Sequence, residues 1–409
     1  MSGFHRIFSG WNSTQHSRAA LVNICWGARS RGLRRNFKVG FLHGLRTQTD
    51  SCLHSDPSPP ATIVGMETLP HYEVAFWQVH ETEEDCDLII RTNNGRAFYC
   101  TISPSRFCRS PKLTEQYFKC LDLLRSGEQE KDDFYEEDAC DWLLKLFEPL
   151  VAQLAPSSLA VSEISRPTLS QYLFPLYFVC GLEVANEVLR PYQMETQNHG
   201  WSSPSIVVKN DVLIDLDQWA KSYHPSDVEI IYNHPEDILI KRPTKVLVDA
   251  GNNSKATCYF KRFGLSFGPA YAKKELMTLK KVVMAQIPSP PEAWICRLHG
   301  VVRVGDKLMG MLFIWIDTKG VLSKARADQS SADLRKRWKT QISTSLEKLH
   351  HKGIIWGDVK AENVLIDSDD NAWIIDFGGS YTHGWVDKEK AGTLAGDAQG
   401  LAKILDILQ

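Results

Sequence analysis

Several common signatures are missing from this 409-residue chain, and each absence excludes a class of protein. Its ten cysteines are scattered and include no CxxC pair, so no zinc module is indicated and reduced intracellular thiols are expected. No apolar run reaches the roughly 20 residues that a transmembrane helix needs, since Ser170 and Gln171 interrupt the most apolar stretch, residues 169–182. The formal net charge is only −2, so charge indicates no nucleic-acid partner, and no membrane partner is expected.

Acidic residues are also missing from the first 49 positions, which carry basic residues and several serines. The basic residues are Arg6, Arg18, Arg29, Arg31, Arg34, Arg35, Lys38 and Arg46. This composition is typical of a mitochondrial transit peptide, but a disordered basic tail, or translated sequence upstream of a true start at Met66, explains it as well. We predict a leader over residues 1–65 and a cytoplasmic or nuclear protein, or a mitochondrial one if the leader is a genuine transit peptide.

Residues 66–225 are predicted to form a small α/β domain of unknown role. Alternating and β-branched segments from Tyr72 onward predict strands, and Asn93-Asn94-Gly95 predicts a hairpin turn between two of them. Apolar residues at helical spacing predict helices over 112–126 and 139–154. The segment 205–215 is interpreted as another hairpin. None of these segments indicates a chemistry.

The second half of the chain has a different order of elements. Over residues 226–317, segments rich in β-branched and aromatic residues predict five strands, with a helix over 270–283 among them. Residues 332–350 predict an amphipathic helix, which opens a mostly helical region over 318–409. Its apolar stripe is Leu334, Trp338, Ile342, Leu346 and Leu349.

The most informative segment is GDVKAENVLID, residues 357–367, which contains Asp358, Lys360 and Asn363. Asp376-Phe377-Gly378 follows 18 residues after Asp358. Phosphoryl transfer needs a carboxylate that orients the acceptor hydroxyl, together with Asn and Asp oxygens that bind magnesium. A chance match to six specified positions is expected about 10⁻⁵ times in a chain of this length, so coincidence is a poor explanation.

On these motifs, residues 237–400 resemble the protein-kinase-like superfamily, and the segment HKGIIWGDVKAENVLID is similar to divergent fungal protein kinase-like proteins. The resemblance implies an α+β, protein-kinase-like bilobal fold, preceded here by the small α/β domain. Residues 226–317 would form a five-stranded small lobe with one helix, and residues 318–409 a shortened, mostly helical large lobe. It also implies ATP and Mg²⁺ as cofactors.

The resemblance assigns roles to individual side chains. Asp358 would orient the acceptor hydroxyl, and Lys360 would stabilise charge on the γ-phosphate. Asn363 and Asp376 would bind magnesium. Lys261 and Glu275, fourteen residues apart, match the order of the strand lysine and helix glutamate that hold the α and β phosphates. Leu365 would form the apolar floor under the adenine.

The chain departs from the family pattern at several positions. Gly251 stands alone in DAGNNSKAT, where kinases usually show three glycines. Tyr259 replaces the usual alanine above the adenine, where a phenol would crowd the base. Trp356 and Gly357 precede Asp358, so no arginine is available there to receive an activation-loop phosphate.

The segment between Asp376 and Asp397 is short and contains no APE motif. Either the large lobe is minimal, as in small-molecule kinases, or residues 66–225 pack against it as a substitute. Three functions therefore stay open. The first is a protein serine/threonine kinase acting on a protein substrate, the second a kinase for a small-molecule acceptor, and the third a pseudokinase that serves as a binding or scaffold module.

Overall fold

The computed structural model describes residues 70–409 except 80–83, 107–109, 127, 129, 132, 157–165, 186–187, 196–202, 204, 264–267, 378 and 380–381. The predicted leader, residues 1–65, therefore lies outside the described residues. Within the described part, three hydrophobic cores organise the chain: one in an amino-terminal α/β unit, one on the outer face of a small lobe, and one shared by the small and large lobes. No described helix combines the length and hydropathy that crossing a membrane requires.

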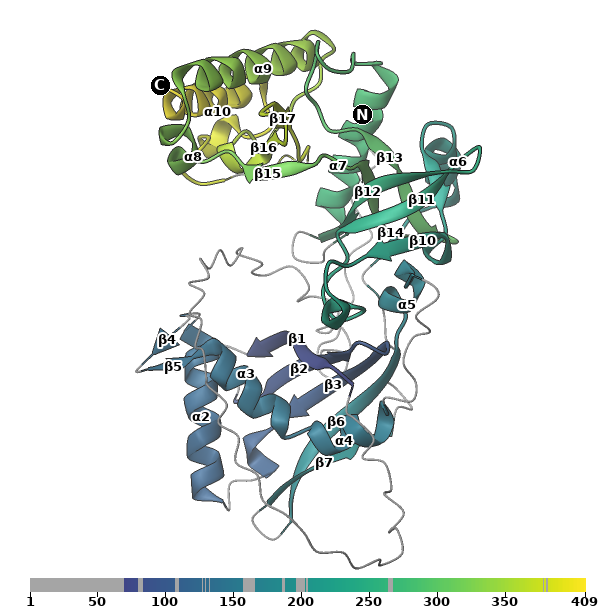
Figure 1. Cartoon of the computed structure of the whole chain (residues 1–409), viewed down its shortest axis with the longest axis vertical. Helices are drawn as coiled ribbons and strands as arrows, with labels where there is room; N and C mark the ends of the chain where they lie inside the picture. Colours follow the sequence, from purple (N-terminus) through teal and green to yellow (C-terminus); the bar gives the residue numbers. More distant parts are fainter. Residues whose placement is uncertain are drawn as a thin grey trace, which may run out of the picture.

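The amino-terminal unit is a sheet covered by helices on one face (Figure 1). Its strand order is β1-β2-β3-β6-β7, and every neighbouring pair is antiparallel except β3 with β6. The strands are β1 (Tyr72–Val79), β2 (Cys86–Thr92), β3 (Arg96–Ile102), β6 (Leu176–Ala185) and β7 (Val188–Gln193). The covering helices are α2 (Pro111–Ser126), α3 (Glu136–Lys145) and α4 (Glu148–Leu154), and a short hairpin joins β4 (Glu130–Lys131) to β5 (Phe134–Tyr135).

The single helix predicted over 139–154 is wrong, because two helices occupy this region. Helix α3 ends at Lys145, and α4 begins at Glu148 with Pro149 in its first turn. Proline has no amide hydrogen to donate and its ring clashes with the preceding turn, so it is tolerated at a helix start but not inside a continuous helix.

The small lobe is built on a twisted sheet with strand order β10-β11-β12-β14-β13-β9, to which β8 adds by pairing with β14. The strands are β8 (Ile206–Val207), β9 (Lys221–Tyr223), β10 (Val228–Ile231), β11 (Lys245–Gly251), β12 (Ser254–Arg262), β13 (Leu298–Val304) and β14 (Lys307–Ile314). Its helices are α5 (Leu169–Leu173), α6 (Asn210–Asp217) and α7 (Gly268–Met284).

Two predictions about this lobe need correction. The hairpin predicted over 205–215 is wrong: only Ile206–Val207 is extended, and a helix begins at Asn210. The boundary drawn between residues 225 and 226 divides one sheet, because β9 pairs in parallel with β13. The sheet therefore contains β8 and β9 in addition to the five strands expected.

The large lobe combines helices with a small sheet of order β15-β16-β17. Its elements are α8 (Lys324–Asp328), α9 (Ala332–His351), α10 (Leu394–Ile407), β15 (Thr318–Val321), β16 (Val364–Asp367) and β17 (Ala372–Ile374). Helix α9 extends one residue beyond the predicted range. Ser331 caps its first turn, and its apolar stripe packs into the shared core, buried except for the partly buried Leu334. Gly353, just beyond its end, has a φ of 66°, which releases the chain toward the motif loop.

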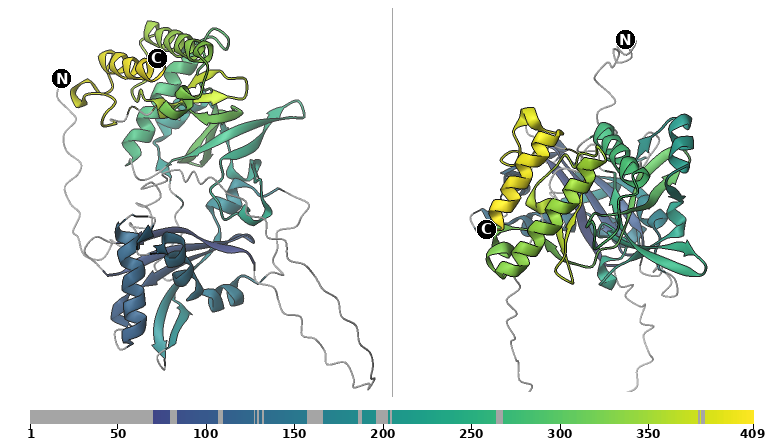
Figure 2. Two further views of the ribbon diagram at one scale, coloured as in Figure 1. Left: turned by 60° about the vertical axis from the view of Figure 1, so that its left-hand side comes forward. Right: turned by 90° about the horizontal axis from the view of Figure 1, so that it is seen from above.

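The three parts follow one another along the long axis of the molecule, with the small lobe between the amino-terminal unit and the large lobe (Figures 1 and 2). The amino-terminal unit therefore does not pack against the large lobe, which was one of the two alternatives. It contacts the small lobe instead. Arg91, only 1% exposed, donates from β2 to the carbonyl oxygens of Tyr172 and Leu239 at 2.6 and 2.9 Å, and Lys241 forms an ion pair with Glu73.

Candidate active site

A cavity of about 390 Å³ opens between the two lobes. The small lobe contributes side chains from β12 and β14 to it, and the large lobe contributes β16 and the residues after β17. Its lining consists of Thr244, Tyr259, Lys261, Glu275, Cys296, Phe313, Ile314, Trp315, Ile316, Thr318, Leu365, Ile375 and Asp376. The cavity is thus apolar along most of its wall and charged at one end, which suits a flat heterocycle that carries a charged group.

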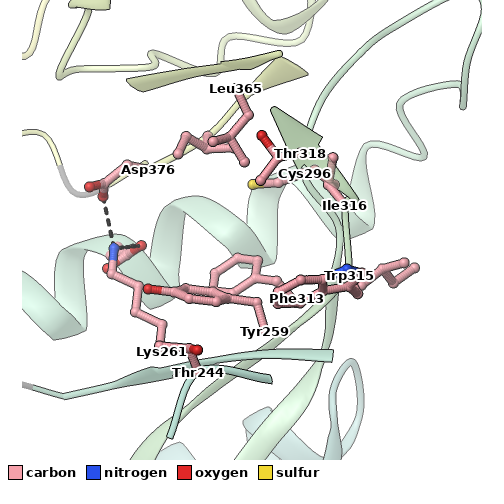
Figure 3. A pocket seen from close by; sticks show the side chains of 13 residues that line it. Thr244, Tyr259, Lys261, Cys296, Phe313, Trp315, Ile316, Thr318, Leu365 and Asp376 are labelled. Carbon is pink, nitrogen blue, oxygen red and sulfur yellow. Dashed lines mark hydrogen bonds and ion pairs between the residues drawn. The ribbon is translucent and has the colours of Figure 1, made fainter. Parts of the chain in front are cut away.

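The charged end is organised around Lys261 (Figure 3). Its Nζ lies 2.6 Å from Oε1 of Glu275 on α7 and 2.8 Å from Oδ1 of Asp376 in the large lobe. Burial alone would lower the pKa of the Lys261 ammonium, but the two carboxylates outweigh burial and raise that pKa. Burial raises the pKa of Glu275, and Asp376 adds to the effect although Lys261 opposes it. The lysine is therefore a permanent cation at the mouth of an apolar cavity.

Local backbone structure explains how Asp376 reaches this position. Strand β17 ends at Ile374, and the amide of Ile375 donates to the carbonyl oxygen of Asn363 at 3.1 Å, so the two motif loops lie side by side. Asp376 itself has a φ of 63°, a left-handed conformation that is uncommon for residues other than glycine. A backbone held in this region commonly marks a functional site.

The second cluster surrounds Asp358. The side-chain Nδ2 of Asn363 and the ammonium of Lys360 each donate to Oδ2 of Asp358 at 2.8 Å. The hydroxyl of Thr382 donates to Oδ1 at 3.0 Å, and Lys360 also reaches this hydroxyl at 3.1 Å. Asp358 and Asn363 are each 5% exposed. The structure thus brings together three of the predicted residues and adds Thr382, which the sequence analysis missed.

A buried carboxylate beneath the loop holds this cluster in place. Asp397 of α10 accepts hydrogen bonds from the backbone amides of Trp356 and Gly357 and from Nε2 of His350, each at 2.8 Å. These two amides immediately precede Asp358, so their fixed orientation sets the direction in which the Asp358 side chain leaves the backbone. Asp397 therefore braces the loop that carries Asp358, which is called the catalytic loop below.

The two predicted departures at glycine positions have a structural basis. Gly357 has a φ of 86°, and a Cβ there would lie 2.9 Å from Cα of Gly379, so no arginine fits. In the β11–β12 turn, Gly251 pairs with Ser254, which leaves Asn252 and Asn253 as a two-residue loop. Both asparagines have positive φ values, 52° and 58°, which is the conformation of a tight type I′ hairpin and one that asparagine tolerates.

The predicted contacts with the flat part of a ligand come from opposite walls. Leu365 lines the cavity from the large lobe, and Tyr259 lines it from the small lobe at 40% exposure (Figure 3). The sequence analysis missed Phe313, Cys296 and Thr244 as lining residues. No local signal marks them, because distant partners bring them to the cavity: Phe313 pairs with Tyr259 in the sheet, and the Cys296 amide donates to the carbonyl oxygen of Ile374. Burial raises the pKa of the Cys296 thiol to about 12, so it is no nucleophile at neutral pH.

The donor set is compatible with magnesium. The side-chain Nδ2 of Asn363 is engaged with Asp358, so its side-chain oxygen would be the ligand atom of that residue. Asp376, whose Oδ1 pairs with Lys261, would offer its other carboxylate oxygen. Among the described residues no cluster of three or more His, Cys, Asp and Glu side chains could hold a metal by itself. An incomplete set of oxygen ligands fits Mg²⁺, which normally completes its octahedron with phosphate oxygens and water.

Comparison with known proteins agrees with this geometry. Residues 283–395 match the family model described as protein kinase domain. The chain is 38% identical over 58 residues to hormonally up-regulated neu tumor-associated kinase of Mus musculus, covering 14% of this chain and 8% of that protein. It is 30% identical over 104 residues to ribosomal protein S6 kinase beta of Caenorhabditis elegans (24% and 17%) and 30% over 117 residues to protein kinase 2 of Dictyostelium discoideum (26% and 22%).

The chain thus spans less than a quarter of the length of these relatives. The matched range contains Asp358, Lys360, Asn363, Leu365 and Asp376 but begins after Lys261 and Glu275. For that pair the argument is the observed ion pair and its position in the cavity.

Proposed function

Because its motif region and its fold place this chain in the protein-kinase-like superfamily, we propose that it is an ATP- and Mg²⁺-dependent phosphotransferase. It transfers the γ-phosphoryl group of ATP to a hydroxyl group, with a protein serine or threonine as the acceptor. The observation that carries the proposal is a pair of charged clusters, one at the end of the interlobe cavity and one in the adjacent loop, which the hydrogen bond from the Ile375 amide to the Asn363 carbonyl oxygen holds side by side. Lys261 with Glu275 and Asp376 forms one cluster, and Asp358 with Lys360 and Asn363 forms the other.

Each cluster has a defined task in this proposal. When bound, Mg-ATP supplies an electrophilic γ-phosphorus whose surrounding charge is partly neutralised. Lys261, fixed by Glu275, presents its ammonium to the nucleotide phosphates, and the apolar wall between Tyr259 and Leu365 takes the base. Asp358 accepts the hydrogen bond of the acceptor hydroxyl and thereby aligns its oxygen for attack. Lys360 offers positive charge where the transition state gains negative charge.

The identity of the acceptor rests on two observations that favour different readings. A lysine two residues after the aspartate, as at Lys360, resembles the pattern of serine/threonine kinases rather than that of tyrosine kinases. One matching relative is named serine/threonine-protein kinase kin-29 of Caenorhabditis briggsae. The segment between Asp376 and Asp397 is short, however, and its Thr382 already contacts Asp358. This second observation favours a small-molecule acceptor as the alternative.

A binding assay and a transfer assay together test the proposal. A thermal-shift titration with ATP, with and without Mg²⁺, should show a magnesium-dependent rise of the melting temperature, since a ligand that prefers the native state stabilises it. Lys261→Met should weaken this response. Asp358→Ala should keep it but lower the transfer rate by about a hundredfold or more, the usual effect of removing a positioned acid–base group.

Asp369→Asn is a suitable control, because Asp369 lies in the turn after β16, away from the cavity lining. Transfer to mixed peptides and to metabolite pools should be compared for all variants. A wild-type chain whose melting temperature does not change on addition of Mg-ATP would contradict the proposal and favour the scaffold function. Wild-type transfer to metabolites but not to peptides would select the small-molecule alternative.

A further inference from the structure

Helix α7 reaches two different places with two successive side chains. Glu275 points to Lys261 in the cavity, whereas Lys274 donates from its Nζ to the carbonyl oxygen of Gly379 at 3.1 Å. Successive residues of a helix are about 100° apart around its axis, so one helix can contact Lys261 in the cavity and the Gly379 backbone at the same time. Gly379 belongs to the activation segment, which we define as the described residues of the range 376–397, that is, without residues 378 and 380–381.

Two glycines of this segment make room for the same ammonium group. A Cβ on Gly379 would lie 2.7 Å from Nζ of Lys274, and a Cβ on Gly392 would lie 3.4 Å from it. Both glycines have positive φ values, 63° and 70°, a conformation that other residues rarely adopt. Residues near the beginning and near the end of the activation segment therefore meet at one lysine of α7.

The same segment also touches the catalytic loop. Gly379 lies so close to Gly357 that a Cβ on Gly357 would be 2.9 Å from its Cα. Gly357 directly precedes Asp358 and occupies the place where an arginine would otherwise receive a phosphate. A continuous series of contacts thus runs from the catalytic loop through Gly379 and Lys274 to α7, and from Glu275 to Lys261.

We infer that Lys274 is a positioning residue that orders the activation segment without phosphorylation. Its cation binds a backbone carbonyl of the segment, and this contact takes the place of an arginine–phosphate pair. The inference rests on the proposed function for its effect on catalysis, but not for its effect on the segment itself. Because Leu276, Leu279 and Val282 anchor α7 in the shared core, loss of the tether should leave the Lys261–Glu275 pair in place.

Hydrogen exchange and steady-state kinetics on the full chain test this inference. In Lys274→Ala, amides of residues 382–393 should exchange about five- to tenfold faster, the effect of losing one charge-assisted hydrogen bond at an exposed site. The kcat should fall by a similar factor, while the KM for ATP stays within about twofold because the cavity residues are unchanged. Lys274→Arg should restore both values, since a guanidinium can donate to the same carbonyl.

Lys273→Ala is the matched control, because Lys273 is the exposed neighbour on the same helix and no ion pair or hydrogen bond of its side chain is seen among the described residues. Equal exchange rates in Lys274→Ala and Lys273→Ala would overturn the inference whatever the activity. A chain that transfers no phosphate, but in which only Lys274→Ala accelerates exchange, would refute the proposed function and retain the tether. Faster exchange in Lys274→Ala with an unchanged kcat would refute the effect of the Lys274 contact on catalysis.

Discussion

Replacing Asp397 by asparagine should separate the support of the catalytic loop from nucleotide binding. Asp397 is 1% exposed, and its Oδ2 accepts from the Trp356 amide and from His350, while its Oδ1 accepts from the Gly357 amide. Asparagine has nearly the same shape but only one acceptor oxygen. Whichever way its amide is oriented, at least one buried donor then faces an NH₂ group instead of an oxygen.

The expected cost follows from this count. Losing one charge-assisted hydrogen bond and leaving its buried donor unsatisfied costs about 1.5–3 kcal/mol. Asp397→Ala removes all three acceptor contacts, so its free energy of unfolding should fall by about 4 kcal/mol or more. Because the two amides precede Asp358, Asp397→Asn should also reduce phosphate transfer by about tenfold or more, an effect expected of misplaced catalytic groups. The magnesium-dependent thermal shift with ATP should remain.

Urea unfolding measures the first effect, and transfer kinetics measure the second. Asp406→Asn provides the control, because Asp406 lies on the same helix but is exposed, and among the described residues its side chain is seen to hydrogen-bond only with Gln409. Unfolding free energies of Asp397→Asn and Asp406→Asn that agree within about 0.5 kcal/mol, the usual range for surface substitutions, would refute the reasoning. Full transfer activity of Asp397→Asn, measured together with a lowered free energy of unfolding, would also refute the reasoning.

Two further predictions concern stability. Arg91→Met leaves the carbonyls of Tyr172 and Leu239 without their buried guanidinium donor, so the free energy of unfolding should fall by about 2–4 kcal/mol. The amino-terminal unit should then unfold separately, which gives a two-step urea curve. A single transition at the wild-type urea concentration would contradict this. For Asp367, burial opposes ionisation, but hydrogen bonds from Trp373 and Asn371 outweigh burial and lower its pKa below 3.8. Its stabilising effect is therefore present above pH 3.8 and is lost as the pH falls through the lower, folded-state pKa. Asp367→Asn should lose this part of the acid dependence in urea curves recorded at about pH 7 and pH 3, and an unchanged difference between the two pH values would refute it.

Local patterns in the chain predicted the elements whose signal is repeated or tightly spaced. The stripe of α9 recurs at every turn, and its burial follows from that periodicity. The failures lie where a distant partner decides the conformation. Ile206 and Val207 are extended because they pair with β14 about one hundred residues later, and the chain then turns into α6. Nothing in the alternation of residues 205–215 contains that information.

The sequence by itself determined the chemistry of the site, because Asp358, Asn363 and Asp376 lie in two short loops joined by a β-hairpin, whose spacing the chain fixes locally. Only the tertiary structure decided which side chains share the cavity and hold its loops. The residues that only packing brings into place come from separate elements, and they are Thr382, Lys274, Phe313 and the two partners of Arg91. Side chains far apart in sequence meet only when burial of the cores brings their elements together, and short-range spacing cannot encode that meeting.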